Sequence, residues 1–260
     1  MKHSILKFLI FCLPLALLNA QETPKKLLAI FAHPDDEQSV APLLVKSLQE
    51  GVEVTLVIAT DGRLGVNQYT DYVAGDELAS LRRQEMRCAA EVLGVKLIHL
   101  NYHDQLKAAE GFDGHVPHAQ SLILELKEIV LKEKPDAIIT WGPDGVTTHM
   151  DHRLVGASAT QVYLSTPFEK PVDLYYFATP SDLLPTERSK TLRGQEKRFL
   201  TVQIPFTSQQ YDQAYQALLC HQSQYPTEVV LKMKEDRKQF GNILYLRQLA
   251  TPSEVKTSLF

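Results

Sequence analysis

The sequence predicts an α/β protein built on an open, mostly parallel sheet with helices on both faces. Apolar segments of strand length alternate with segments of helix length along most of the chain, which is typical of a doubly wound sheet. The apolar segments are short and continuous, as in strands buried on both faces. Because no linker interrupts this alternation, we expect one domain over residues 21–260.

Four strand–helix pairs make up the first part of this domain. The strands are apolar runs expected at 27–32, 52–59, 95–100 and 137–141. The helices that follow them are expected at 37–50, 76–93, 118–134 and 151–164. Gly51 and Gly94 directly follow two of these helices, where glycine accepts the left-handed conformation of a C-terminal cap. Pro135 ends the third helix.

The remainder of the chain, from about Pro171, contains two strand-like pieces and one helix. We expect the strands at 172–177 and 199–204 and the helix at 209–220. This part is predicted to complete the sheet and to form one wall of the site described below.

The N-terminus has the layout of a secretory signal peptide. Lys2 and Lys7 precede an apolar run from Phe8 to Leu18, and a polar stretch follows Ala20. Residues 1–20 are therefore predicted to be a signal peptide, with export to the periplasm or the exterior and no stable membrane span after cleavage. The alternative is an uncleaved N-terminal anchor.

Composition narrows the partners of the protein. The formal net charge is -4 at pH 7, with no basic stripe, so we expect no nucleic-acid partner. No C-x-x-C pair suggests a thiolate metal site. After the predicted cleavage Cys88 and Cys220 remain, and the sequence leaves open whether they form a disulfide or stay two separate thiols. The oligomeric state is likewise open.

Two polar clusters follow predicted strands and carry the chemistry. Ala32-His33-Pro34-Asp35-Asp36-Glu37 follows the first strand, and Thr148-His149-Met150-Asp151-His152 follows the fourth. In doubly wound sheets the ends of such strands flank the crevice where ligands bind. We therefore expect the two clusters to meet there.

The combined clusters offer ligands for a metal and groups for hydrolysis. Two histidines and one aspartate suit zinc with an open position, and they also suit ferrous iron. A further carboxylate could take a proton from water bound to the metal, and an imidazolium could stabilise the oxyanion. Taken singly, each carboxylate could instead cap a helix, and each histidine could be a polar loop residue.

The pattern A-H-P-D-D-E followed by H-x-D-H resembles the PIG-L/LmbE-like family of zinc-dependent de-N-acetylases. Further similar elements are Thr60-Asp61-Gly62 with Gly65, the R-x-x-E…L-G helix from Arg82 to Gly94, the turn at Tyr102–Asp104, and the H-x-S-Q element at His221–Gln224. The resemblance covers nearly all of the predicted mature chain. It implies a Rossmann-like open sheet and an N-acetylated amino sugar as substrate.

The resemblance also implies roles for residues of the two clusters. His33, Asp36 and His152 are the implied metal ligands, and Asp35 is the implied general base. His149 is implied to polarise the amide carbonyl and to stabilise the oxyanion.

Three other residues have less direct roles. Asp151 is implied to orient an imidazole, with His149 as the expected partner, and its charge is expected to favour the protonated form of His149. Arg82 is implied to reach the sugar or a neighbouring polar group of the substrate. His221 could contact the substrate or support the site, although its place at a helix end is favourable for a cationic side chain in any case.

The sequence thus predicts a metal-dependent hydrolase that removes the N-acetyl group from N-acetylglucosamine-containing substrates by attack of metal-bound water. Zn²⁺ is the expected cofactor, with Fe²⁺ or another divalent transition metal as the alternative. Rival interpretations are a hydrolase of another N-acyl amide and a non-catalytic glycan-binding protein of the same fold. A nucleotide-binding protein is disfavoured because no G-x-G-x-x-G follows the first strand.

Overall fold

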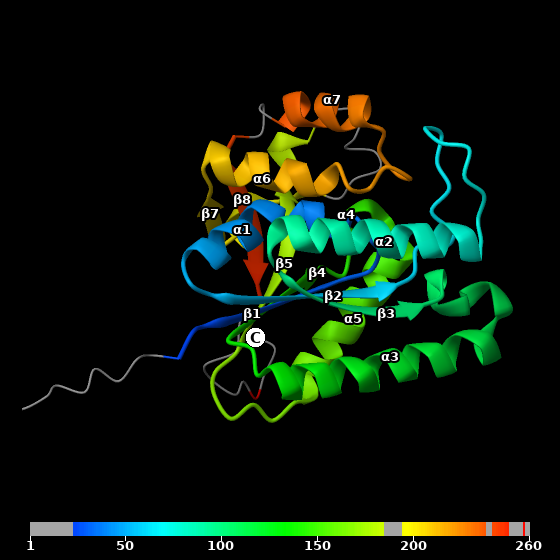
Figure 1. Cartoon of the computed structure of the whole chain (residues 1–260). Helices are drawn as coiled ribbons and strands as arrows, with labels where there is room; N and C mark the ends of the chain where they lie inside the picture. Colours follow the sequence, from blue (N-terminus) through cyan, green and yellow to red (C-terminus); the bar gives the residue numbers. More distant parts are fainter. Residues whose placement is uncertain (1–22, 185–193, 238–240, 250–256, 258–260) are drawn as a thin grey trace, which may run out of the picture.

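The computed structural model describes residues 23–184, 194–237, 241–249 and 257. The predicted signal peptide, residues 1–20, lies outside the described residues. The described chain forms a sheet of eight strands with helices on both of its faces (Figure 1). None of the described helices is long and apolar enough to cross a membrane.

Five parallel strands form the first part of the sheet. They are β1 (Lys26–Phe31), β2 (Glu53–Thr60), β3 (Lys96–Tyr102), β4 (Ala137–Trp141) and β5 (Asp173–Pro180). Their order in the sheet is β3-β2-β1-β4-β5, so β1 pairs with both β2 and β4. The strand order reverses between β1 and β4, which places the ends of these two strands at the crevice of the fold. The predicted fold class is confirmed.

The C-terminal part of the chain extends this sheet with antiparallel strands. β8 (Ile243–Gln248) pairs with β5, and β7 (Val202–Pro205) pairs with β8. A short strand, β6 (Gly194–Gln195), also pairs with β5. The strand expected at 199–204 begins later than predicted, because η5 (Lys197–Phe199) is a 3-10 turn.

Helices cover the two faces of the sheet in two groups. On one face lie α1 (Ala41–Gln49), α2 (Asp76–Leu93) and α6 (Ser208–Leu218), with α6 packed on the other two. On the opposite face α3 (Phe112–Glu133) packs against α5 (Met150–Ser165), as Figure 1 shows below the strands. The helix α7 (Thr227–Arg237) was not predicted.

Two helices differ from their predicted bounds. The helix expected at 37–50 is divided into η1 (Asp36–Ser39), a 3-10 turn, and α1, which begins at Ala41. Pro42 stands at the start of α1, where its missing N–H costs nothing. The helix expected from 118 begins at Phe112 and contains Pro117. Pro117 cannot donate a helical hydrogen bond, but it does not end the helix, which packs against α5.

The contact of α5 with β4 and a disulfide on α2 fix two of the helices near the site. Gly156 on α5 lies against the end of β4, where an added Cβ would be 2.3 Å from the carbonyl oxygen of Trp141. Only glycine permits this contact without a shift of the helix. On the other face a disulfide joins Cys88 on α2 to Cys220, which follows α6. The disulfide decides between the two alternatives that the sequence left open.

Candidate active site

The two clusters meet in a pocket of about 330 Å³ beyond the ends of β1 and β4. Its lining includes the seven residues assigned to the site from the sequence, namely His33, Asp35, Asp36, Arg82, His149, Asp151 and His152. The loop after β2 and the segment after α6 complete the wall, through Leu64 and Gly65 and through Gln224 and Tyr225. The structure therefore brings every predicted site residue to one place.

Asp36 is held by three N–H donors on one of its oxygens. Oδ2 accepts the backbone N–H of Ala32 at 2.9 Å and of His33 at 2.8 Å, and the indole Nε1–H of Trp141 at 3.2 Å. Oδ1 lies 3.1 Å from Nε2 of His152. Hydrogen bonding to the charged form stabilises it. The charges of His152 and His33 also hold the pKa of Asp36 well below its usual range, although burial alone would raise it.

Each of the two expected histidine ligands is oriented by an oxygen on one ring nitrogen. His152 donates from Nδ1 to the carbonyl of Gly145 at 3.0 Å, which leaves Nε2 facing Asp36. His33 donates from Nε2 to Oδ2 of Asp151 at 2.9 Å, and its Nδ1 lies 3.5 Å from Oδ2 of Asp36. Metal-binding histidines are held in this way, with one nitrogen bonded to an oxygen and the other free for the metal.

The donor atoms fit a divalent transition metal. His33, His149 and His152 offer ligand atoms that lie within 4.8 Å of one another, and Asp36 lies between two of them. His33, Asp104 and Asp151 form a second such group in the described chain. Nitrogen and carboxylate ligands suit zinc and also iron. The assignment of His33, Asp36 and His152 as the ligands stays a prediction.

The ring charges follow from the same contacts. Burial would lower the pKa of His33, but the carboxylates of Asp36 and Asp151 outweigh it and raise the pKa to about 10. The pKa of His152 is also raised, because Asp36 outweighs the effect of burial. Without a metal the His33 ring is therefore protonated on both nitrogens near pH 7, and metal binding would require loss of one of these protons.

Asp35 is the carboxylate left over beside these residues. Its backbone is left-handed, with φ of 101° and ψ of -15°, and its N–H donates to Oε2 of Glu37 at 3.0 Å. Its Oδ1 lies 3.3 Å from the Arg82 guanidinium. Burial raises the pKa of Asp35 to about 6, and Arg82 opposes part of that shift. A carboxylate with a pKa near neutral is suited to accept a proton in a reaction.

The guanidinium of Arg82 bonds to other residues of the protein. Its side chain is 3% exposed, and it donates from Nη1 to the carbonyl of Gly62 at 2.9 Å and from Nη2 to the carbonyl of Pro34. An added Cβ at Gly65 would lie 2.2 Å from Nη1, so a side chain at this position would displace the guanidinium. These contacts position the loop that carries Asp35. The contact of Arg82 with a substrate stays a prediction.

The expected pairing of Asp151 with His149 is wrong. The buried carboxylate of Asp151 accepts from His33 and from the backbone N–H of Gln105, each at 2.9 Å. His149 caps α5 instead, and its Nδ1 accepts the backbone N–H of Asp151 at 3.2 Å. The reason is geometric: at the start of α5, the Asp151 side chain points across the crevice to the loops after β1 and β3.

This arrangement changes the expected charge of His149. Burial lowers its pKa, the nearby His33 and His152 lower it further, and the Asp151 carboxylate does not reverse the shift. His149 is therefore neutral near pH 7, rather than protonated as expected. Because Nδ1 accepts a hydrogen bond, the single proton resides on Nε2. A neutral imidazole in this tautomer remains a hydrogen-bond donor.

Two further carboxylates support the site without having been assigned from the sequence. Asp104 accepts the backbone N–H of Gly62 at 3.0 Å and of Leu64 at 2.7 Å, and so shapes the loop after β2. Glu37 receives the N–H of Asp35 and lies 2.7 Å from Nε2 of His221. Both residues belong to the quoted motifs, but acidic residues at helix starts have an ordinary explanation as caps.

Comparison with known proteins agrees with these motifs. Residues 28–163, which is half of the chain, match the family of GlcNAc-PI de-N-acetylases, PIG-L. This stretch runs from β1 through α5 and contains both clusters.

Individual relatives are similar over the same part of the chain. The 1D-myo-inositol 2-acetamido-2-deoxy-alpha-D-glucopyranoside deacetylase of Corynebacterium glutamicum is 30% identical over 141 residues, which is 49% of this chain and 49% of that protein. The diacetylchitobiose deacetylase of Thermococcus kodakarensis is 32% identical over 136 residues, 51% of this chain and 46% of that protein. The match thus spans about half the length of these relatives.

Solved structures share the fold over a larger part of the chain. The N,N'-diacetylchitobiose deacetylase of Pyrococcus horikoshii has a TM-score of 0.65 at 23% identity, and the match covers 90% of this chain and 87% of that one. The 4-carboxy-2-hydroxymuconate hydratase GalB of Pseudomonas putida has a TM-score of 0.63 at 16% identity, with 90% and 100% covered. The fold therefore supports different reactions, and the residues of the site determine which reaction occurs.

Proposed function

The chain belongs to the PIG-L family of GlcNAc-PI de-N-acetylases, and from this premise we propose that it is a metal-dependent hydrolase that removes the N-acetyl group from an N-acetylglucosamine-containing substrate. The observation that carries the proposal is the position of the Asp35 carboxylate. It stands in the same pocket as a two-histidine, one-carboxylate set and bonds to neither histidine.

The metal in this proposal is Zn²⁺, held by His33, Asp36 and His152. When bound, it lowers the pKa of a water molecule and polarises the carbonyl of the scissile amide. The support for this set is the orientation of both imidazoles by Gly145 and Asp151, which turns their other nitrogens toward Asp36. Fe²⁺ or another divalent transition metal would fit the same donors.

Asp35 takes a proton from the attacking water in the proposed reaction. Its pKa of about 6 keeps most of the carboxyl groups ionised at pH 7, and a conjugate acid of this strength can later return the proton. Arg82 contacts the carboxylate, and Glu37 accepts the backbone N–H of the same residue. The base thus needs no rearrangement before the reaction.

His149 acts on the carbonyl oxygen in the proposed reaction. Its Nε2–H donates a hydrogen bond to the oxygen as negative charge develops there, which is where a fixed donor contributes most. Because the ring is neutral, its contribution is a hydrogen bond from a dipole and not the full charge expected from the sequence. Asp151 supports the site through His33.

The amino-sugar substrate is supported by the relatives, whose names specify a deacetylated 2-acetamido-2-deoxyglucopyranoside and diacetylchitobiose. The likeness to GalB offers a hydratase as a second candidate, on the shared fold alone. Hydrolysis is preferred over that candidate because the family match covers both clusters of the site. The substrate of this chain is an N-acetylated amino sugar in either free or conjugated form.

We also propose that the protein is exported. The basis is the basic and apolar N-terminal pattern, together with the Cys88–Cys220 disulfide, since disulfides persist mainly in oxidising compartments. N-terminal sequencing of material from a native-like host should give a chain that begins at Gln21 or close to it. A chain that starts at Met1 and fractionates with membranes would instead support an anchor.

Acetate release from a panel of N-acetylglucosamine conjugates by the zinc-loaded protein tests the proposed function. Asp35→Asn keeps the shape of the side chain but cannot accept a proton at neutral pH. We expect it to retain the metal and to lose turnover by about a hundredfold or more. Asp236→Asn, an exposed carboxylate on α7 paired with Lys232, is the matched control and should behave as wild type.

Two results would count against different parts of the proposal. Wild-type turnover in Asp35→Asn would reject Asp35 as the base. Binding of the sugars without acetate release by the wild-type protein would reject the hydrolase and support the glycan-binding alternative.

A further inference from the structure

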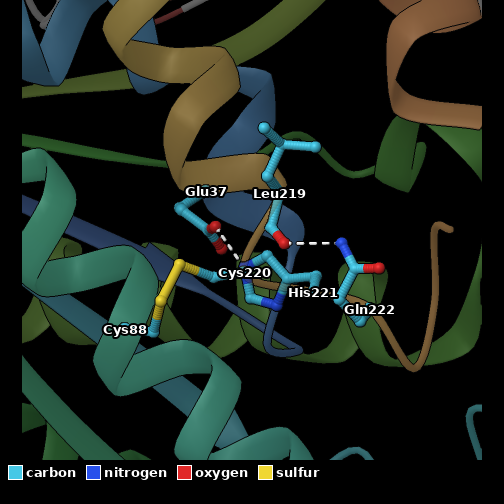
Figure 2. Close-up of a disulfide and its surroundings, with 6 residues drawn as sticks. All are labelled: Glu37, Cys88, Leu219, Cys220, His221 and Gln222. Carbon is cyan, nitrogen blue, oxygen red and sulfur yellow. Dashed lines mark hydrogen bonds and ion pairs between the residues drawn. A yellow bond between two sulfur atoms is a disulfide. The ribbon is translucent and has the colours of Figure 1, made fainter. Parts of the chain in front are cut away.

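The segment after α6 joins α2 to the loop that carries Asp35. Figure 2 shows Cys220 bonded to Cys88 of α2, while the next residue, His221, points toward Glu37. Nε2 of His221 lies 2.7 Å from Oε1 of Glu37, and the two side chains are 0% and 1% exposed. A pair buried this completely is held in one geometry, because neither side chain can exchange its partner for water.

Glu37 connects this pair to Asp35. Its other oxygen, Oε2, accepts the backbone N–H of Asp35 at 3.0 Å. Asp35 has a left-handed φ of 101°, a conformation that a non-glycine residue keeps only where surrounding contacts impose it. One carboxylate thus links the His221 ring to the strained backbone of the proposed base.

A single face of α2 holds the whole arrangement. Arg82, Glu85 and Cys88 follow one another at three-residue spacing, which places them near one side of a helix. Arg82 contacts Asp35, and Glu85 accepts the N–H and the hydroxyl of Ser223 at 2.7 and 2.6 Å. The disulfide closes the same face one turn beyond Glu85. Asp35 and the segment 220–224 are therefore both held by contacts with α2.

From this geometry we propose that the Cys88–Cys220 disulfide, His221 and Glu37 form a positioning unit that holds Asp35 in its reactive conformation. The disulfide fixes the segment on α2, His221 orients Glu37, and Glu37 holds the Asp35 backbone. None of the three touches the substrate in this proposal, so their effect reaches the reaction through Asp35. The inference rests on the proposed function in taking Asp35 as the base.

The first arm of the test varies His221. His221→Leu removes the donor to Glu37 and should lower kcat by roughly tenfold to a hundredfold, the range for a small misplacement of a reacting group, with KM nearly unchanged. His221→Gln keeps an N–H in reach of Glu37. Since Nδ1 of His221 has no hydrogen-bond partner among the described residues, glutamine loses no second bond and should restore most of kcat.

Gln222→Ala is the matched control in the same segment. Gln222 is exposed, and Figure 2 shows its side chain turned away from Glu37 to the carbonyl of Leu219, which it reaches at 2.7 Å. This variant should keep wild-type kcat and KM. A loss of kcat in Gln222→Ala as large as in His221→Leu would make the effect one of general stability and overturn the proposal.

The second arm opens the disulfide in the zinc-loaded protein, by a phosphine reductant on wild type and by the Cys88→Ala/Cys220→Ala double variant. We expect kcat to fall by about tenfold in both, with metal content unchanged. Hydrogen exchange of the peptide 33–39, which contains the Asp35 N–H, should become about tenfold faster. The reductant should have no further effect on the double variant.

The exchange measurement separates this proposal from the proposed function. If wild-type protein releases no acetate, the proposed function fails, yet faster exchange at 33–39 on reduction still supports the positioning unit. Equal exchange at 33–39 and equal kcat in oxidised and reduced wild type overturn it. That comparison needs no substitution, so it decides the matter even where His221→Leu does not fold.

Discussion

Replacing Trp141 by phenylalanine tests whether the support of Asp36 determines metal affinity. Trp141 is 2% exposed, and its Nε1–H is one of the three donors to Oδ2 of Asp36, at 3.2 Å. Its ring also stacks on His152, with centroids 4.3 Å apart and planes 8° apart. Phenylalanine keeps a ring in this place and removes the N–H alone.

The expected magnitude follows from the lost bond. A hydrogen bond to a charged group contributes about 1.5–3 kcal/mol, which corresponds to roughly tenfold to a hundredfold in an equilibrium constant. Changes to the groups that support metal ligands typically weaken binding by about 10–100-fold, the same range. The backbone N–H donors of Ala32 and His33 remain, so the Asp36 carboxylate keeps its position but is held by two hydrogen bonds in place of three. We therefore expect zinc affinity to fall by about 10–100-fold.

A competition titration of the metal-free protein against a chelating zinc dye measures this change. Phe177→Leu is the control, since Phe177 packs edge-on against Trp141 at 5.9 Å and has no bond to Asp36. It should leave the zinc affinity near that of wild type. If Trp141→Phe binds zinc as tightly as wild type, or if Phe177→Leu weakens binding equally, then the indole donor does not support the metal ligand and the reasoning is refuted.

Three further substitutions probe the proposed metal ligand His152, the proposed oxyanion donor His149 and the packing of α5 against β4. His152→Ala should strip most of the metal and the activity together, and full metal content by elemental analysis would remove His152 from the ligand set. His149→Ala should keep the metal and lower kcat by about 10²–10³-fold with little change in KM; steady-state kinetics showing a raised KM alone would make it a binding residue. Gly156→Ala should lower the free energy of unfolding by about 1–3 kcal/mol in urea titrations, because its Cβ meets the Trp141 carbonyl. The exposed Gln161→Ala on the same helix is its control, and equal stability of the two variants would contradict the packing argument.

Local patterns in the sequence were sufficient for much of the fold. The strands at 27–32 and 137–141 are continuous apolar runs between clear breaks, and the structure has β1 and β4 at nearly those bounds. Burial of both faces of a parallel strand selects such runs directly. The strand β8 was missed because its burial alternates only in part and its neighbours in the sheet are more than 35 residues away in sequence.

It was also predictable from the sequence that the residues of the two clusters meet in one pocket, because both clusters follow strands whose ends flank the crevice. The partners of the site residues were not predictable. Asp151 pairs with His33, which lies 118 residues away, and not with its neighbour His149. Arg82 donates hydrogen bonds to the carbonyls of Pro34 and Gly62 and lies beside the Asp35 carboxylate.

Residue types and local periodicity therefore determined the α/β class and the two polar clusters at the strand ends of this protein. The tertiary structure alone decided the lowered pKa of His149 and the hydrogen-bond partners of Arg82. It also decided the link from the Cys88–Cys220 disulfide through His221 and Glu37 to Asp35. The physical reason is that hydrogen-bond partners and pKa values depend on distances and burial across the sheet. Those quantities are set when β1, β4, α2 and α6 pack together, and no short stretch of sequence specifies them.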